Sequence, residues 1–146
     1  SLIRGEPSHD FLDEMQPAPG ETGIDKAGFS AFYASGLDNV LRASGIDHLL
    51  MCGVTTQCCV HSTLRAAVDR GYWCLTVADC CAASEPALHE AAQAKKAGEG
   101  QLCGWLADLD EVARAARPRA GAAITAMRRG GAAPRPSKPR RPPSAR

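Results

Sequence analysis

The chain has 146 residues, which is enough for one domain with a hydrophobic core and too short for two ordinary domains. Its formal net charge of +1 conceals an uneven distribution, because residues 1–113 hold all 16 acidic residues but only 7 of the 17 Lys and Arg residues. No apolar run approaches the ~20 residues of a membrane-spanning helix, and no signal peptide opens the sequence, so we expect a cytoplasmic protein without membrane contact.

The seven cysteines do not indicate a disulfide scaffold, because their number is odd and their spacing irregular. A zinc site is the alternative use of many cysteines, but no C-x-x-C or paired-histidine spacing is present. Most of the cysteines fall in or beside predicted core elements. We therefore expect reduced thiols, no metal and no cofactor.

The first 45 residues contain few regular elements. Residues 1–20 are rich in Gly and Pro and predict an exposed loop, with one short helical turn between Phe11 and Met15. Residues 21–25 are a candidate for a short strand. Apolar residues at helical spacing from Leu37 onward predict a helix that ends at Gly45.

A strand, a tight turn and a helix are predicted over residues 46–71. The apolar run 46–52 indicates a buried strand, and apolar residues recur at helical spacing from about residue 58 to residue 71. This arrangement places Cys59 at or near a helix N-terminus, where backbone N–H groups favour a thiolate and can receive an oxyanion. The alternative is a small buried core residue, which is the usual role of a single cysteine after a strand.

The remaining elements of the body alternate between strand and helix. The sequence predicts a strand over 72–79, a helix over 84–97, a strand over 101–107 and a helix over 108–116 capped by Asp108. Short apolar strands that alternate with helices predict a parallel sheet with helices on both faces, which is a three-layer α/β/α fold. Loops after the strands then meet at one edge of the sheet, where ligand sites of α/β proteins form.

The end of the chain has a different composition. Residues 117–146 are rich in Ala, Gly, Pro and Arg and contain no acidic residue, so we expect a disordered basic tail after a folded domain over 1–116. Basic charge can bind nucleic acid, and a nucleic-acid-binding tail is one alternative function. Because the tail has no aromatic residues for stacking, nucleic-acid binding is not expected.

The stretch 53–67, GVTTQCCVHSTLRAA, followed by DRGY at 69–72, resembles the nucleophile segment of the isochorismatase-like cysteine hydrolases. That family includes nicotinamidases, N-carbamoylsarcosine amidases, ureidoacrylate amidohydrolases and biuret hydrolases. The resemblance covers about residues 1–113, the later part of a longer domain. It implies an isochorismatase-like, Rossmann-like α/β fold with a mainly parallel sheet, whose N-terminal strand or strands are missing here. It also implies a small amide or carbamoyl substrate and a homo-oligomer.

The resemblance gives two residues catalytic roles. Cys59 is implied as the nucleophile of a cysteine amidohydrolase that cleaves a C–N bond through a thioester. Lys26, followed by a Gly-containing linker and Ser-x-Phe, resembles the catalytic lysine, which stabilises developing negative charge and helps relay protons.

Four further residues are implied to bind the substrate or the oxyanion. Backbone N–H groups around Thr55 to Cys59 are expected to hold the oxyanion, and Thr55 and Thr56 belong to that turn. Family members often have a cis peptide before the threonine at the position of Thr55. Phe32 and Tyr33 are expected to lie in the core or the pocket wall and to contact the substrate.

Two features depart from the family pattern. The family's triad has an Asp at the end of a first strand, and no such strand precedes Lys26; neither Asp10 nor Asp13 is assigned to this role. Helix 84–97 carries Gln93, Lys95 and Lys96 where aliphatic residues usually face the sheet, so we expect it to be shortened or loosely packed, with the lysines pointing outward. The alternative to an active enzyme is a truncated, catalytically impaired remnant.

Overall fold

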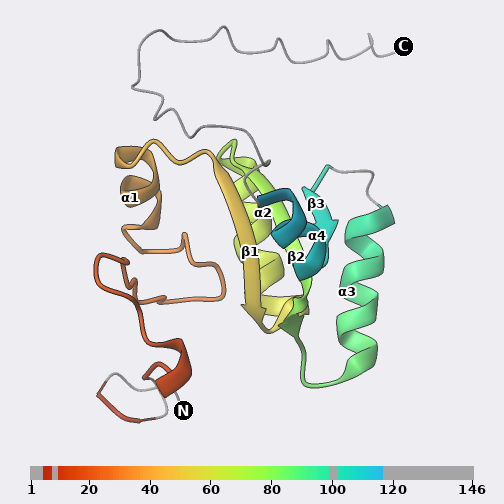
Figure 1. Cartoon of the computed structure of the whole chain (residues 1–146), viewed down its shortest axis with the longest axis horizontal. Helices are drawn as coiled ribbons and strands as arrows, with labels where there is room; N and C mark the ends of the chain where they lie inside the picture. Colours follow the sequence, from red (N-terminus) through yellow and green to blue (C-terminus); the bar gives the residue numbers. More distant parts are fainter. Residues whose placement is uncertain (1–4, 8–9, 99–101, 117–146) are drawn as a thin grey trace, which may run out of the picture. The chain divides into compact units, whose positions relative to one another are not determined.

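Three parallel strands in the order β1–β2–β3 form the sheet (Figure 1). The structure is a computed structural model and describes residues 5–7, 10–98 and 102–116. The strands are β1, His48–Val54; β2, Trp73–Ala82; and β3, Trp105–Ala107. His48 of β1 pairs with Trp73 of β2, and the register shifts between Met51 and Gly53.

Helices connect and flank the strands. They are η1, Asp13–Met15; α1, Leu37–Ala43; the π-helical turn η2, Thr56–Val60; α2, His61–Asp69; α3, Pro86–Gly98; and α4, Leu109–Ala116. In Figure 1, α2 runs behind the sheet and α4 crosses in front of it, so helices lie on both faces. The predicted α/β fold with a parallel sheet is confirmed.

The core lies between α2 and one face of the sheet. Leu64 and Ala67 of α2 are fully buried against Cys74 of β2. They sit three residues apart on one face of the helix, and burial of such a stripe is the main source of stability of a short helix. Phe32 and Tyr72 extend this core toward α1, with ring centroids 5.7 Å apart.

Several element boundaries differ from the sequence prediction. Residues 21–25 form no strand, since an extended segment becomes a strand only when a neighbouring strand supplies backbone partners, and none of the described strands pairs with it. β2 continues three residues beyond Asp79, and β3 begins only at Trp105. The predicted turn near Phe11–Met15 is present as η1, and the predicted tail, 117–146, lies outside the described residues.

α3 corrects the prediction of a shortened helix with outward lysines. It runs thirteen residues, from Pro86 to Gly98. Lys95 does point outward, but Lys96 is only 4% exposed and its Nζ has no hydrogen-bond partner within the described part of the chain. Burial lowers the pKa of Lys96, with the Cys81 thiol acting in the opposite direction. The long aliphatic stem of Lys96 fills the space that an aliphatic residue would occupy.

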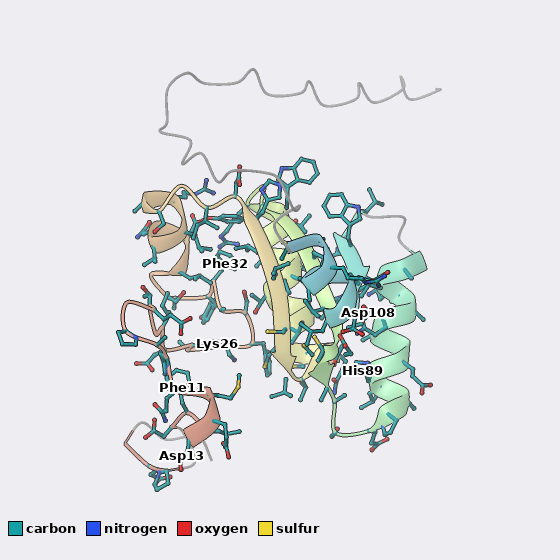
Figure 2. The ribbon with its side chains drawn as sticks, viewed as in Figure 1. Phe11, Asp13, Lys26, Phe32, His89 and Asp108 are labelled. Carbon is teal, nitrogen blue, oxygen red and sulfur yellow. The ribbon has the colours of Figure 1, made fainter. Side chains whose placement is uncertain are left out.

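The start of α4 is fixed by two carboxylates. Glu111 N–H donates to Asp108 Oδ1 (2.7 Å), and Asp108 N–H donates to Glu111 Oε2 (3.0 Å), which is the reciprocal arrangement of a capping box. Leu109 N–H donates to Asp79 Oδ1 at 2.9 Å and so ties α4 to β2. The predicted cap at Asp108, labelled in Figure 2, is confirmed.

None of the helices in the described ranges is both long and apolar enough to cross a bilayer. All seven cysteines have free thiols.

Candidate active site

Lys26 and Cys59 are brought together although 33 residues separate them in the chain. Lys26 lies in the loop before α1 (Figure 2), and Cys59 lies in η2, the turn between β1 and α2. Lys26 Nζ is 3.6 Å from Cys59 Sγ and donates a 2.6 Å hydrogen bond to the carbonyl of Gly28. Cys59 is half-buried.

The loop that carries Lys26 is attached to the helix that follows Cys59. Ala31 N–H donates to Thr63 Oγ1 at 3.0 Å, and Thr63 lies on α2 one turn beyond Cys59. Because one helix both follows the cysteine and anchors the loop, the distance between the lysine and the thiol is set by short local contacts.

Tyr33 borders this loop. Its ring packs against Gly28, where an added Cβ would lie 2.8 Å from Tyr33 Cδ1. The side chain is 64% exposed, so one side of the ring is open to solvent. Tyr33 therefore lies next to the carbonyl group that holds Lys26, in a place where a ligand can reach it.

The turn between β1 and Cys59 is tied at Thr55. The peptide bond between Val54 and Thr55 is cis, as the family resemblance implies. The N–H groups of Cys58 and Val60 both donate to the Thr55 carbonyl, at 3.1 and 3.2 Å. These two N–H groups are thereby used within the turn, which limits candidate oxyanion donors to other N–H groups of the segment 55–59.

Thr56 is completely buried, and its Oγ1 lies 2.9 Å from Nδ1 of His89 on α3. The structure thus gives Thr56 a structural partner within the protein. His89 was not singled out by the sequence analysis. The available signal was the helical spacing of His89, Gln93 and Lys96, which places three polar residues on one face of α3.

Phe32 lies in the core next to the loop. It is 6% exposed and packs against the ring of Tyr72. The guanidinium of Arg70 lies over the Phe32 ring, 4.9 Å from its centroid. This packing accounts for an aromatic residue at position 32 without a ligand, and contact of Phe32 with a substrate stays a prediction.

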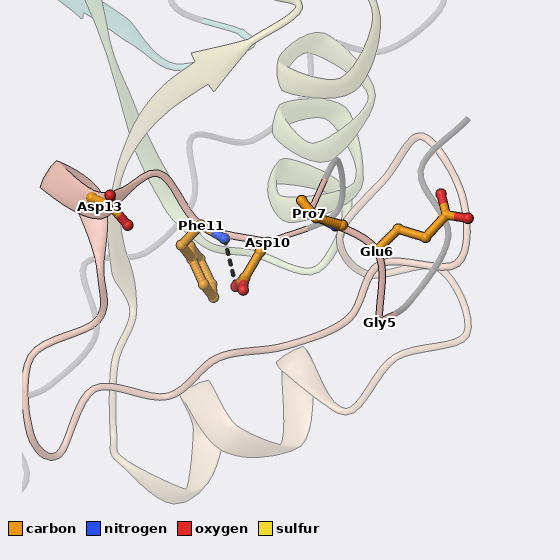
Figure 3. A pocket seen from close by; sticks show the side chains of 6 residues that line it. All are labelled: Gly5, Glu6, Pro7, Asp10, Phe11 and Asp13. Atoms are coloured by element: carbon orange, nitrogen blue, oxygen red, sulfur yellow. Dashed lines mark hydrogen bonds between the residues drawn. The ribbon is translucent and has the colours of Figure 1, made fainter.

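A cavity of about 460 Å³ lies elsewhere, in the N-terminal segment (Figure 3). It is lined by Gly5, Glu6, Pro7, Asp10, Phe11 and Asp13. Asp10 Oδ1 accepts a 2.8 Å hydrogen bond from Phe11 N–H. The lining contains neither Lys26 nor Cys59, and the described residues include no group of three His, Cys, Asp or Glu side chains that could hold a metal ion.

Residues 1–111 match the family model described as the isochorismatase domain. The chain belongs to the isochorismatase family.

Named relatives of this family member hydrolyse amides. Ureidoacrylate amidohydrolase RutB of Serratia proteamaculans is 36% identical over 109 residues, which are 75% of this chain and 43% of the relative. The RutB protein of Variovorax paradoxus is 34% identical over 122 residues, which are 80% of this chain and 46% of the relative. The chain thus spans less than half the length of these curated relatives.

Two solved structures are similar in fold to this chain. An isochorismatase-like hydrolase from Alkaliphilus metalliredigens superposes with a TM-score of 0.73 at 27% identity, covering 77% of this chain and 60% of that one. N-carbamoylsarcosine amidase from Thermoplasma acidophilum superposes with a TM-score of 0.64 at 27% identity, covering 73% and 59%.

Proposed function

We propose that the protein hydrolyses a C–N bond of a small amide or carbamoyl compound, with Cys59 as nucleophile. The observation that carries the proposal is the 3.6 Å separation of Lys26 Nζ and Cys59 Sγ. A thiol that serves only as core filler has no need of a cation beside it, whereas a nucleophilic thiol is activated by one.

The proposed reaction has two stages. Cys59 sulfur attacks the carbonyl carbon, and the carbonyl oxygen becomes an oxyanion held by backbone N–H groups of the 55–59 turn. The C–N bond then breaks, the nitrogen takes up a proton and leaves as ammonia or an amine, and a thioester remains on Cys59. Water attacks this thioester, which releases the acid and restores the thiol.

Lys26 is proposed to supply positive charge at the sulfur and to relay the proton to the leaving nitrogen. Its second contact, the hydrogen bond to the Gly28 carbonyl, keeps the ammonium near Sγ when the substrate is absent. Tyr33, which packs against Gly28, and the N–H groups of the turn that carries Cys59 are proposed to line the substrate site.

The relatives support a substrate class for the proposal. Two of them are a ureidoacrylate amidohydrolase and an N-carbamoylsarcosine amidase, and both names denote substrates with a carbamoyl-type group. This supports a small carbamoyl compound as the substrate, and the homo-oligomer implied by the resemblance remains a proposal.

The test is ammonia release from biuret, ureidoacrylate-like amides and nicotinamide by the full chain and by Cys59→Ala. Cys58→Ala is the matched control, because it removes the neighbouring thiol from the same turn. We expect release by the parent and by Cys58→Ala, and none by Cys59→Ala. A folded parent that releases no ammonia from any of these amides would contradict the proposal and favour a catalytically impaired protein.

A further inference from the structure

The inward face of α3 is polar, which is unusual for a helix that covers a sheet. His89, Gln93 and Lys96 lie at positions i, i+4 and i+7, and the two residues that α3 buries are Ala92 and Lys96. Burial of one alanine methyl contributes little apolar area. Hydrogen bonds from the polar side chains therefore add contacts between α3 and its neighbours.

Each of two polar side chains on this face reaches a different element. Gln93 Nε2 donates to the Ala78 carbonyl of β2 at 3.4 Å, whereas His89 Nδ1 shares a 2.9 Å hydrogen bond with Thr56 Oγ1 of η2. His89, labelled in Figure 2 on the side of α3 toward the sheet, therefore contacts the turn that carries Cys59. The hydrogen bond of Gln93 goes to the strand and not to the turn.

Thr56 is the fixed point of that turn. Its side chain is completely buried, and it directly follows Thr55, whose carbonyl receives the N–H groups of Cys58 and Val60. A displacement of Thr56 would rotate the adjoining peptide groups, including those with N–H groups still able to bind an oxyanion. Such donors act only within a narrow distance from the oxygen, and a shift of about 1 Å costs roughly 100-fold in rate.

We propose that His89 is a positioning residue, which holds the Thr55–Val60 turn through Thr56 so that its backbone N–H groups meet the oxyanion formed on Cys59. This proposal rests on the proposed function, because the oxyanion is the one formed in amide hydrolysis. The hydrogen bond between His89 and Thr56 should affect the reactions of Cys59 that form an oxyanion and leave its other reactions unchanged.

Two reagents that modify Cys59, one through an oxyanion and one without, test this proposal in the full 146-residue chain. p-Nitrophenyl acetate acetylates Cys59 through an oxyanion: the sulfur bonds to the acetyl carbon, the bond to oxygen breaks, p-nitrophenolate leaves with the electron pair, and the thiol proton goes to buffer. Iodoacetamide alkylates the same sulfur by displacing iodide and forms no oxyanion. The absorbance of released p-nitrophenolate, after subtraction of the rate for Cys59→Ala, measures acetylation of Cys59 even where water then hydrolyses the thioester. Peptide mass spectrometry measures alkylation at Cys59, and the ratio of the two rates reports on the N–H donors.

We expect Thr56→Val and His89→Ala to lower this ratio at least tenfold, while Thr56→Ser and His89→Asn stay within about threefold of the parent, because they keep a polar atom near its original position. In the double variant Thr56→Val with His89→Ala, the ratio of the two rates should be no lower than in either single variant, since both substitutions remove the same hydrogen bond. Gln93→Leu is the matched control on the same helix face and should leave the ratio unchanged.

An unchanged ratio in Thr56→Val, or an equal loss in Gln93→Leu, would overturn the proposal. If Thr56→Val does not fold, the variants His89→Asn and His89→Gln test the proposal instead. Asn places its amide near the position of Nδ1, which bonds Thr56, whereas Gln places it near Nε2. A ratio of acetylation to alkylation that is no higher in His89→Asn than in His89→Gln would overturn the proposal. A parent that is acetylated at Cys59 but releases no ammonia from amides contradicts the proposed function alone. A parent that is alkylated but never acetylated overturns both.

Discussion

The hydroxyl of Tyr72 donates a 2.7 Å hydrogen bond to the Asp38 carboxylate and so joins the start of β2 to α1. Arg42 adds a 3.1 Å ion pair to the same carboxylate from one turn further along α1. The Tyr72 hydrogen bond, followed by the one from Arg42, lowers the pKa of Asp38. Burial, together with the Asp38 charge, raises the pKa of Tyr72.

The variant Tyr72→Phe should raise the pKa of Asp38 toward its ordinary value. A carboxyl whose pKa is lower in the folded than in the unfolded state contributes stability above its unfolded pKa, and this contribution is lost as the pH falls through the folded pKa. The parent should therefore lose stability on acidification below about pH 4, and Tyr72→Phe should lose less over the same interval. Carboxyl-carbon NMR titration and urea melts at several pH values measure both effects, and Tyr33→Phe is the matched control.

Replacement of Lys26 by Met should lower the rate of amide hydrolysis about 100-fold, because the variant retains the stem and removes the charge beside Cys59 Sγ. The loss should be in kcat, since Lys26 acts on the thiol and the leaving nitrogen. Steady-state ammonia release measures this, with Lys95→Met as the control for loss of one positive charge. A Lys26→Met variant with unchanged kcat would contradict the proposed role.

Lys96 leads to a prediction about stability. Because burial lowers its pKa, the folded state disfavours the charged form, and stability should rise as the pH increases from the folded pKa toward the ordinary value. Lys96→Met fills the same space without an unpartnered ammonium and should raise the free energy of unfolding at neutral pH by roughly 1–3 kcal/mol. Lys95→Met, at the exposed neighbouring position, should change it by less than about 0.5 kcal/mol.

Urea unfolding at pH 7 and at pH 10 tests this. The gain from Lys96→Met should shrink at the higher pH, where the parent's ammonium is partly neutral. A variant less stable than the parent would indicate that Lys96 has a partner in solution.

The helices and strands around the sheet could be read from the sequence because their patterns are local. The apolar run before Gly53, the spacing of Leu64 and Ala67, and the cap at Asp108 each depend on neighbouring residues. The prediction of a strand over residues 21–25 is wrong, because a strand depends on a partner strand elsewhere in the chain. Sequence reasoning about strands must therefore include the partner as well as the segment.

Less of the candidate site than of the fold can be predicted from the sequence. The pairing of Lys26 with Cys59 was suggested by family resemblance, since no spacing rule joins residues 33 positions apart. His89 is not singled out by the sequence, and the outward orientation expected for Lys96 is wrong, because polar residues at helical spacing usually mark the solvent face. His89 faces the buried hydroxyl of Thr56, which lies on a different element, so the local pattern of α3 alone does not reveal this contact.

Gly104 provides the last prediction. Its φ is +94°, and a methyl group at this position would overlap the carbonyl oxygen of Cys74 in the neighbouring strand. Gly104→Ala therefore combines an unfavourable backbone conformation with a steric overlap and should destabilise the fold by at least about 2 kcal/mol.

Gly71→Ala separates the two causes. Gly71 also has a positive φ, +86°, but a methyl group there meets no atom within 4 Å, so its cost should be about 1 kcal/mol from the backbone alone. Urea unfolding of both variants measures the difference. Equal destabilisation would mean that β3 moves away from Cys74 without cost, and that the close approach of Gly104 to β2 does not hold the edge strand in place.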